Sequence, residues 1–144
     1  MEAAQERVIV GVDGSEASVR ALRWAIRYAE RTGATVDVVY VWQVPALYGD
    51  PVRVLPGDRI AEAAQEALRA TVDRELGGRT SPKVRCIPQG GYPSQALVER
   101  SAAADLLVVG NRGLGGFKGV LLGSVSLRCV AHAACPVVVV RSPD

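Results

Sequence analysis

The sequence has no long hydrophobic run. Its most apolar stretches, LLVVG and CPVVVV, are far shorter than the roughly 20 residues that a membrane-spanning helix requires. The first residues, MEAAQER, are polar, and the first apolar run, VIVGV, is short and already contains Gly11. These features predict no membrane association and no signal peptide, so we expect a cytoplasmic protein.

Cysteine and histidine are scarce. The three cysteines, Cys86, Cys129 and Cys135, form no CxxC pair, and any pairing leaves one over. We therefore expect small buried hydrophobic residues in a reducing compartment, with a redox or metal-binding role as the alternative. The single histidine, His132, is expected in the last turn of a helix, where a partly cationic ring suits the helix dipole.

A large excess of charge of either sign is also absent. The formal net charge of +2 is too small to indicate nucleic-acid binding by itself. Hydrophobic residues make up 49% of the 144 residues, which is typical of a globular protein. A chain of this length can bury a core without disulfides, and we expect one domain covering residues 1–144.

What the sequence does contain is a regular alternation of two patterns. Short runs of Val, Ile and Leu predict strands, and apolar residues at helical spacing predict helices. Ser15 is expected to cap the first helix and Gly33 to end it. Residues 43–58, with three prolines and two glycines, are expected to form a long loop that could cover a ligand. The predicted strands are residues 7–13, 34–42, 83–89, 105–110 and 136–141, and the predicted helical segments are residues 15–33, 59–76, 93–103 and 124–133.

This alternation predicts an α/β fold, in which an open, doubly wound parallel sheet carries helices on both faces. Near-continuous apolar strands fit a sheet that is covered on both faces. The last strand is short, very apolar and terminal, which indicates a sheet edge. Such an edge favours pairing with a second copy of the chain, and the alternative is that Arg141 and the tail shield it.

A glycine-rich stretch, GNRGLGGFKGVLLGS, follows the fourth predicted strand. Ligands of open α/β sheets bind beyond the carboxyl ends of the strands, where the strand order reverses. We expect that point to lie between the ends of the first and fourth strands. Gly110 would let a ligand approach the backbone closely, and Gly113 would permit the turn.

The helix after this stretch is expected to offer an anion site. Ser124 is predicted to cap it, and its first N–H groups, together with the Ser126 hydroxyl, would attract negative charge. Arg112 and Lys118 add positive charge. A serine cap is more often purely structural, and loop cations are more often simply solvated, but together these features favour a phosphate-bearing ligand.

Two common phosphate-binding motifs are missing. The pattern GxxxxGK[ST] does not occur, and GxGxxG follows none of the predicted strands. A P-loop nucleotidase and a standard dinucleotide-dependent dehydrogenase are therefore excluded.

The spacing that does occur is Gly110, Gly113 and then Gly123-Ser124, followed by a helix and HAACPVVVVR. This pattern resembles the universal stress protein family, in its ATP-binding branch. The segments VIVGVDGSEAS, GATVDVVYVW and ADLLVVGNRGLGGFKGVLLGSVS are similar to that family as well, so the resemblance covers nearly the whole chain. It implies the adenine nucleotide alpha hydrolase-like fold with strand order 3-2-1-4-5, and a homodimer formed through the last strand.

The resemblance also implies ATP as the ligand, with Mg²⁺ on its phosphates. Val41 would contact adenine through its main chain, and Asp13 would be the metal ligand, although a carboxylate after a strand is often a turn or helix cap. Asn111 stands where the family commonly has Ser or Thr. The implied nucleotide contacts are Gly11, Val12, Asp13, Val41, Gly110, Arg112, Gly113, Gly123, Ser124, Val125 and Ser126.

The expected function is that of an ATP-binding regulatory module in the stress response. Phosphoryl transfer needs an oriented nucleophile and stabilised charge. Arg112 and Lys118 could stabilise charge, but Asp13 is the only acidic candidate near the loop. Binding is thus favoured over turnover. The alternatives are a slow ATPase or self-phosphorylating enzyme, a binder that prefers AMP or cyclic AMP, and a relative of the electron-transfer flavoproteins.

Overall fold

The computed structural model describes residues 5–42, 57–113 and 122–142. In this part of the chain, parallel strands alternate with helices, and the sheet order is β3-β2-β1-β4-β5. The predicted fold class and strand order are confirmed, and every predicted boundary lies within two residues of the observed one. The elements are β1 (Arg7–Val12), α1 (Glu16–Thr32), β2 (Thr35–Trp42), α2 (Gly57–Leu76), β3 (Val84–Gly90), α3 (Pro93–Ser101), β4 (Leu106–Gly110), α4 (Ser124–His132) and β5 (Val137–Val140).

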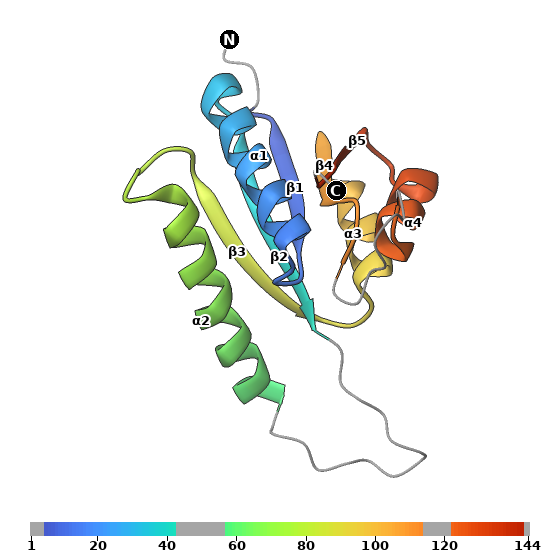
Figure 1. Cartoon of the computed structure of the whole chain (residues 1–144), viewed down its shortest axis with the longest axis horizontal. Helices are drawn as coiled ribbons and strands as arrows, with labels where there is room; N and C mark the ends of the chain where they lie inside the picture. The colour runs from blue at the N-terminus through green and yellow to red at the C-terminus, as the bar shows by residue number, and fades with distance from the viewer. Residues whose placement is uncertain (1–4, 43–56, 114–121, 143–144) are drawn as a thin grey trace.

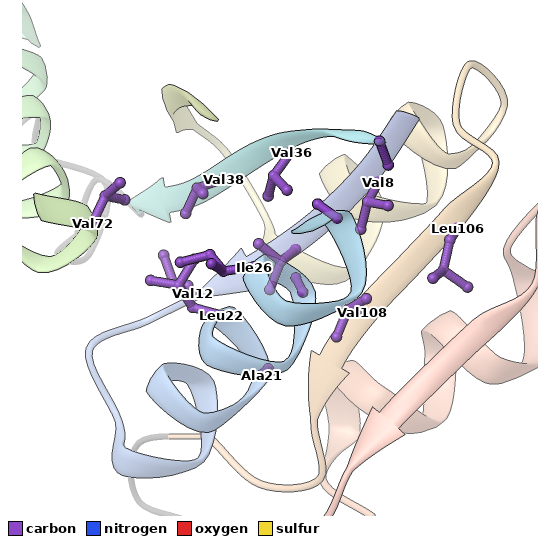
Figure 2. Close-up of a cluster of buried hydrophobic side chains, with 14 of the residues drawn as sticks. Val8, Val12, Ala21, Leu22, Ile26, Val36, Val38, Val72, Leu106 and Val108 are labelled. Atoms are coloured by element: carbon purple, nitrogen blue, oxygen red, sulfur yellow. The ribbon is translucent and has the colours of Figure 1, made fainter. Parts of the chain in front are cut away.

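The sheet is packed on both faces. Successive residues of a strand point to opposite sides, and the side chains on each side belong to a separate hydrophobic cluster. Val8, Val10 and their counterparts on β2 and β4 pack against α1 and α2, as Figure 2 shows for part of this cluster. Ile9 and Leu107 point the other way and pack with Leu97 of α3. Figure 1 shows α2 beside β3 at one end of the sheet and α4 at the other end. This arrangement leaves the carboxyl ends of the central strands to the loops.

Helix α1 begins and ends as predicted. The Ser15 side chain accepts a hydrogen bond from the Ser18 N–H at 3.2 Å, which caps the first turn. Gly33 has a φ of 78°, and its N–H donates to the Ala29 carbonyl. None of the described helices combines the length and apolarity needed to span a membrane.

The three cysteines are buried or half-buried, and the single histidine lies at the end of a helix. Cys129 is fully buried among the side chains between the sheet and α3–α4, and this burial raises the pKa of its thiol to about 11. Cys86 and Cys135 are half-buried, and burial also raises the pKa of each thiol. His132 lies in the last turn of α4, as predicted. The hydrophobic role predicted for cysteine is confirmed most clearly at Cys129.

Candidate functional site

The ends of β1 and β4 lie side by side at the point where the strand order reverses. The two strands pair in parallel, with Val8 opposite Leu106 and Val10 opposite Val108. Strands β2 and β3 lie on one side of β1, and β4 and β5 lie on the other. The topology thus places the residues after Val12 next to those after Gly110, where open α/β sheets bind ligands.

The glycines within these two strand ends are closely packed. A Cβ atom on Gly110 would lie 2.7 Å from the main-chain oxygen of Ala17, so α1 crosses β4 only because this residue is glycine. A Cβ atom on Gly11 would lie 2.7 Å from a methyl carbon of the buried Leu97 on α3. From the sequence, Gly110 is expected to allow close approach of a ligand. Helix packing accounts for this glycine in the structure.

Asp13 links the β1 end to the connection that follows β4. Its Oδ1 accepts a hydrogen bond from the Ser15 N–H at 2.8 Å, and its own N–H donates to the Ser18 hydroxyl at 3.2 Å. A Cβ atom on Gly113 would lie 2.7 Å from Asp13 Oδ2. Asp13 therefore does form the turn contact that was its structural alternative, and its second carboxylate oxygen lies against Gly113.

The two ends of the glycine-rich stretch meet at Asn111. Its carbonyl accepts a hydrogen bond from the Gly123 N–H at 2.6 Å and lies 3.2 Å from the Ser126 hydroxyl. A Cβ atom on Gly123 would lie 3.5 Å from the Cα of Arg112 and 3.8 Å from the Gly113 nitrogen. Gly113 and Gly123 are thus brought together, while residues 114–121, including Lys118, lie outside the described part of the chain.

The start of α4 corrects one prediction. Gly123, not Ser124, is the N-cap residue, and no side chain caps this helix end. The reason is that Asn111 holds Gly123 in an extended conformation (φ −78°, ψ 175°), so Ser124 is the first helical residue and its side chain is exposed.

The side chains of Val125 and Ser126 do not face the proposed anion site, so these two residues could bind an anion only through their main-chain N–H groups. The Ser126 hydroxyl was predicted to attract an anion, and this prediction is wrong. Ser126 is 2% exposed, and its hydroxyl donates to the main-chain carbonyl oxygens of Asn111 and Gly123, so it stabilises the turn instead. The Val125 side chain packs toward the core beneath α4. Because the first N–H groups of a helix have no intrahelical partner, the Ser124–Ser126 amides form the anion-attracting end of α4.

Val41 lies just beyond the last β1–β2 pair. That pairing ends at Val12 and Tyr40, whereas β2 continues alongside β3 to Trp42. The N–H of Thr35 donates toward β1, and the Trp42 carbonyl accepts from Gly91 on the β3 side. Main-chain groups alternate along a strand, so the Val41 carbonyl faces the β1 side, past the end of the ladder.

A contact that the sequence did not predict joins Ser142, which lies two residues after β5, to this region. The Ser142 N–H donates to Asn111 Oδ1 at 3.2 Å, and the Arg112 guanidinium donates to the Ser142 hydroxyl. Asn111 is 4% exposed, and its own N–H donates to the Val140 carbonyl. Because about 30 residues separate these partners, no local sequence signal could have indicated the contact.

The chemistry of the junction fits a phosphate ligand better than a metal held by protein alone. Among the described residues, no group of three or more His, Cys, Asp and Glu side chains is arranged to hold a metal ion. The Asp13 carboxylate could contribute one oxygen to an Mg²⁺ ion that is otherwise bound by phosphates and water. His132 lies at the opposite end of α4, about 12 Å along the helix axis, so it is not an acid–base group of this junction.

Comparison with known proteins agrees with this description. The model of the universal stress protein family matches residues 5–141. A universal stress protein of Methanocaldococcus jannaschii is 32% identical over 96% of this chain and 83% of its own length. One from Thermus aquaticus is 34% identical over 93% of this chain and 97% of its own length. Against mycobacterial relatives that are 36–38% identical, the chain spans only about 45–48% of their length.

Solved structures show the same fold. UspA from Lactobacillus plantarum has a TM-score of 0.80 and 26% identity, and the match covers 97% of this chain and all of that one. A universal stress protein in complex with cAMP has a TM-score of 0.70 and 32% identity, over 96% of this chain and 98% of that one. The chain described here therefore belongs to the universal stress protein family.

Proposed function

We propose that this protein binds ATP at the junction of β1 and β4 and acts as a nucleotide-dependent regulatory module. The observation that carries the proposal is the convergence of Asp13, Gly113 and Gly123 at the point where the strand order reverses. Small residues there leave the main chain and the N-terminus of α4 accessible to phosphate. The relative in complex with cAMP supports an adenine nucleotide as the ligand class.

Each part of the nucleotide has a proposed contact. The adenine ring lies against the Val41 main chain, past the end of the β1–β2 ladder. The ribose and phosphates lie against Gly110, Arg112 and Gly113. The remaining proposed contacts are Gly11 and Val12 at the end of β1, and Gly123, Ser124, Val125 and Ser126 at the start of α4.

Mg²⁺ accompanies the phosphates in this proposal, with Asp13 as its protein ligand. A Mg²⁺ ion bound to nucleotide phosphates usually takes one or two carboxylates from the protein. Oδ1 of Asp13 accepts a hydrogen bond from the Ser15 N–H, and Oδ2 lies 2.7 Å from the position of a Cβ on Gly113. When bound, the cation would neutralise phosphate charge.

Binding is favoured over hydrolysis. A hydrolase must orient a water molecule near the transferred phosphoryl group. Asp13 is the acidic side chain at the junction, and it already forms the turn contact with Ser15. Any ATP turnover is therefore expected to be slow.

A cyclic AMP binder is the second candidate, because the relative at 32% identity was solved in complex with cAMP. Both functions place the adenine and a phosphate at the same strand ends. The number of phosphates separates the two candidates, since ATP carries three and cyclic AMP carries one.

We also propose a homodimer formed through β5. This edge strand consists of four half-buried valines, and among the described residues it pairs with β4 alone. The neighbouring α4 exposes Leu127 and Val130, at 56% and 51% of their surfaces. Light scattering of the purified protein should give a mass twice that of one chain. Val139→Lys, which places a charge on the edge strand, should give the mass of one chain.

The nucleotide proposal is tested by denaturing the purified protein and identifying any released nucleotide by mass spectrometry. Intact ATP supports the binder, and cyclic AMP supports the second candidate. ADP alone, together with steady phosphate release, would favour an enzyme. The absence of any nucleotide, combined with no thermal shift on adding ATP, ADP, AMP or cyclic AMP, would contradict the site.

A further inference from the structure

Ser142, the second residue after β5, contacts both Asn111 and Arg112, the two residues that follow β4. Ser142 donates its N–H to Asn111 Oδ1 at 3.2 Å, and its hydroxyl accepts a hydrogen bond from Arg112. We call these two hydrogen bonds the C-terminal contact. It joins the end of the edge strand to the first residues of the glycine-rich connection.

Asn111 connects this contact to the start of α4. Its side chain bonds Ser142, while its carbonyl accepts the Gly123 N–H at 2.6 Å. At 4% exposure it has little freedom to move, and a buried amide is costly to leave without a partner. A displacement of the Asn111 side chain would therefore be transmitted to Gly123.

Arg112 is oriented by the same contact. Its Cα lies 3.5 Å from the position of a Cβ on Gly123, so its backbone borders the first turn of α4. A guanidinium is long and flexible, and holding it in one orientation before binding lowers the entropy cost of a phosphate contact. The Ser142 hydroxyl supplies such a restraint from outside the glycine-rich connection.

We propose that Asn111 and Ser142 are positioning residues that hold Arg112 and Gly123 ready for the nucleotide phosphates. This inference rests on the proposed function, and it makes Ser142, two residues beyond the edge strand, a determinant of nucleotide affinity. It also gives a physical link between the proposed dimer edge and the proposed binding site.

The first test needs no nucleotide. Amide hydrogen exchange is compared between the wild-type protein and Asn111→Ala, which removes the acceptor of the Ser142 N–H. Exchange should become faster at Ser142 and also at Gly123, although the acceptor of Gly123 is the unchanged carbonyl of residue 111. Unchanged exchange at Gly123 would show that the side chain does not position this turn.

The second test measures nucleotide affinity by isothermal titration. Ser142→Ala should raise the Kd for ATP about three- to tenfold, which is the size of one ordinary hydrogen bond and fits a residue that acts by positioning Arg112. The matched control is Thr80→Ala, an exposed residue between α2 and β3 at the opposite edge of the sheet, which should leave the Kd unchanged.

Two comparisons separate positioning from a general structural role. Ser142→Ala should not change the affinity for adenosine, which has no phosphate, and it should have no further effect in an Arg112→Gln background. Equal ATP affinity of wild type and Ser142→Ala, or an equal loss for adenosine, would overturn the proposal. If the wild-type protein itself bound no ATP, the proposed function would fail, while the exchange experiment would still decide whether the contact positions Gly123.

Discussion

The glycines within the strand ends and the glycines of the connection after β4 have different surroundings. At Gly110 and Gly11, the space of a Cβ is already occupied by Ala17 and Leu97, which belong to covering helices. At Gly113 and Gly123, it borders Asp13 and the main chain of residues 111–113. The first pair therefore permits helices to pack against the sheet, whereas the second pair permits close contacts within the proposed binding site.

The largest effect on stability is expected at Gly110. Gly110→Ala places a carbon 2.7 Å from a main-chain oxygen of α1, which cannot move without shifting the helix. We expect the free energy of unfolding to fall by about 3 kcal/mol, at the upper end for overpacked sites. Urea unfolding measures this change, and a loss below that of Gly11→Ala would contradict the packing explanation.

Gly123→Val should lower the affinity for ATP while leaving the stability of the protein nearly unchanged. The added Cβ would lie 3.4 Å from the Asn111 carbonyl oxygen, and the φ of −78° at residue 123 is one that residues other than glycine adopt. We expect near-normal stability but an ATP Kd raised at least about tenfold, a loss of about 1.4 kcal/mol, because the added methyl groups cover the first turn of α4. Calorimetric titration and a thermal melt of the same sample check both parts. Unchanged affinity would mean that this glycine does not border the ligand.

Asp13 has both a structural contact, with the Ser15 N–H, and a proposed role as the Mg²⁺ ligand. A matched pair of variants separates the two. Asp13→Asn keeps an acceptor for the Ser15 N–H but removes the charge, so stability should hold while the Mg²⁺ dependence of ATP affinity disappears. Asp13→Ala should also lose about 1 kcal/mol of stability, since the turn contact is gone. Titrations with and without EDTA give the first result. A persistent Mg²⁺ dependence in Asp13→Asn would exclude this carboxylate as the metal ligand.

The smallest effect is expected at Gly11. A Cβ there meets only the methyl group of Leu97, and a side chain can change its rotamer where a main chain cannot move. We expect Gly11→Ala to lower the free energy of unfolding by about 1 kcal/mol. Urea unfolding checks this value. A much larger loss would mean that Leu97 has no space to adjust.

The sequence predicted the fold well because the determining signals are local. Runs such as VIVGV are buried on both faces, so they carry no competing helical pattern. Ser15 begins α1 with a side-chain hydrogen bond, and Gly33 ends it with a positive φ. The strand order was implied by the family resemblance alone, and that order places the residues after β1 beside those after β4.

The parts of the site that the sequence did not predict depend on contacts between distant segments. Ser124 looked like the helix cap, but the Asn111 carbonyl makes Gly123 the cap residue instead. The reason for Gly110 became visible only when α1 was placed against β4. The role of Ser142 likewise required the pairing of β4 with β5, which brings the chain end to Asn111.

The most direct measurement of the central claim is amide hydrogen exchange of the wild-type protein with and without ATP and Mg²⁺. We expect slower exchange on ATP addition at Gly113 and at the Ser124–Ser126 amides of α4, with no change near Thr80 at the opposite edge of the sheet. No change at the β1–β4 junction, or protection confined to other parts of the molecule, would contradict a nucleotide site there.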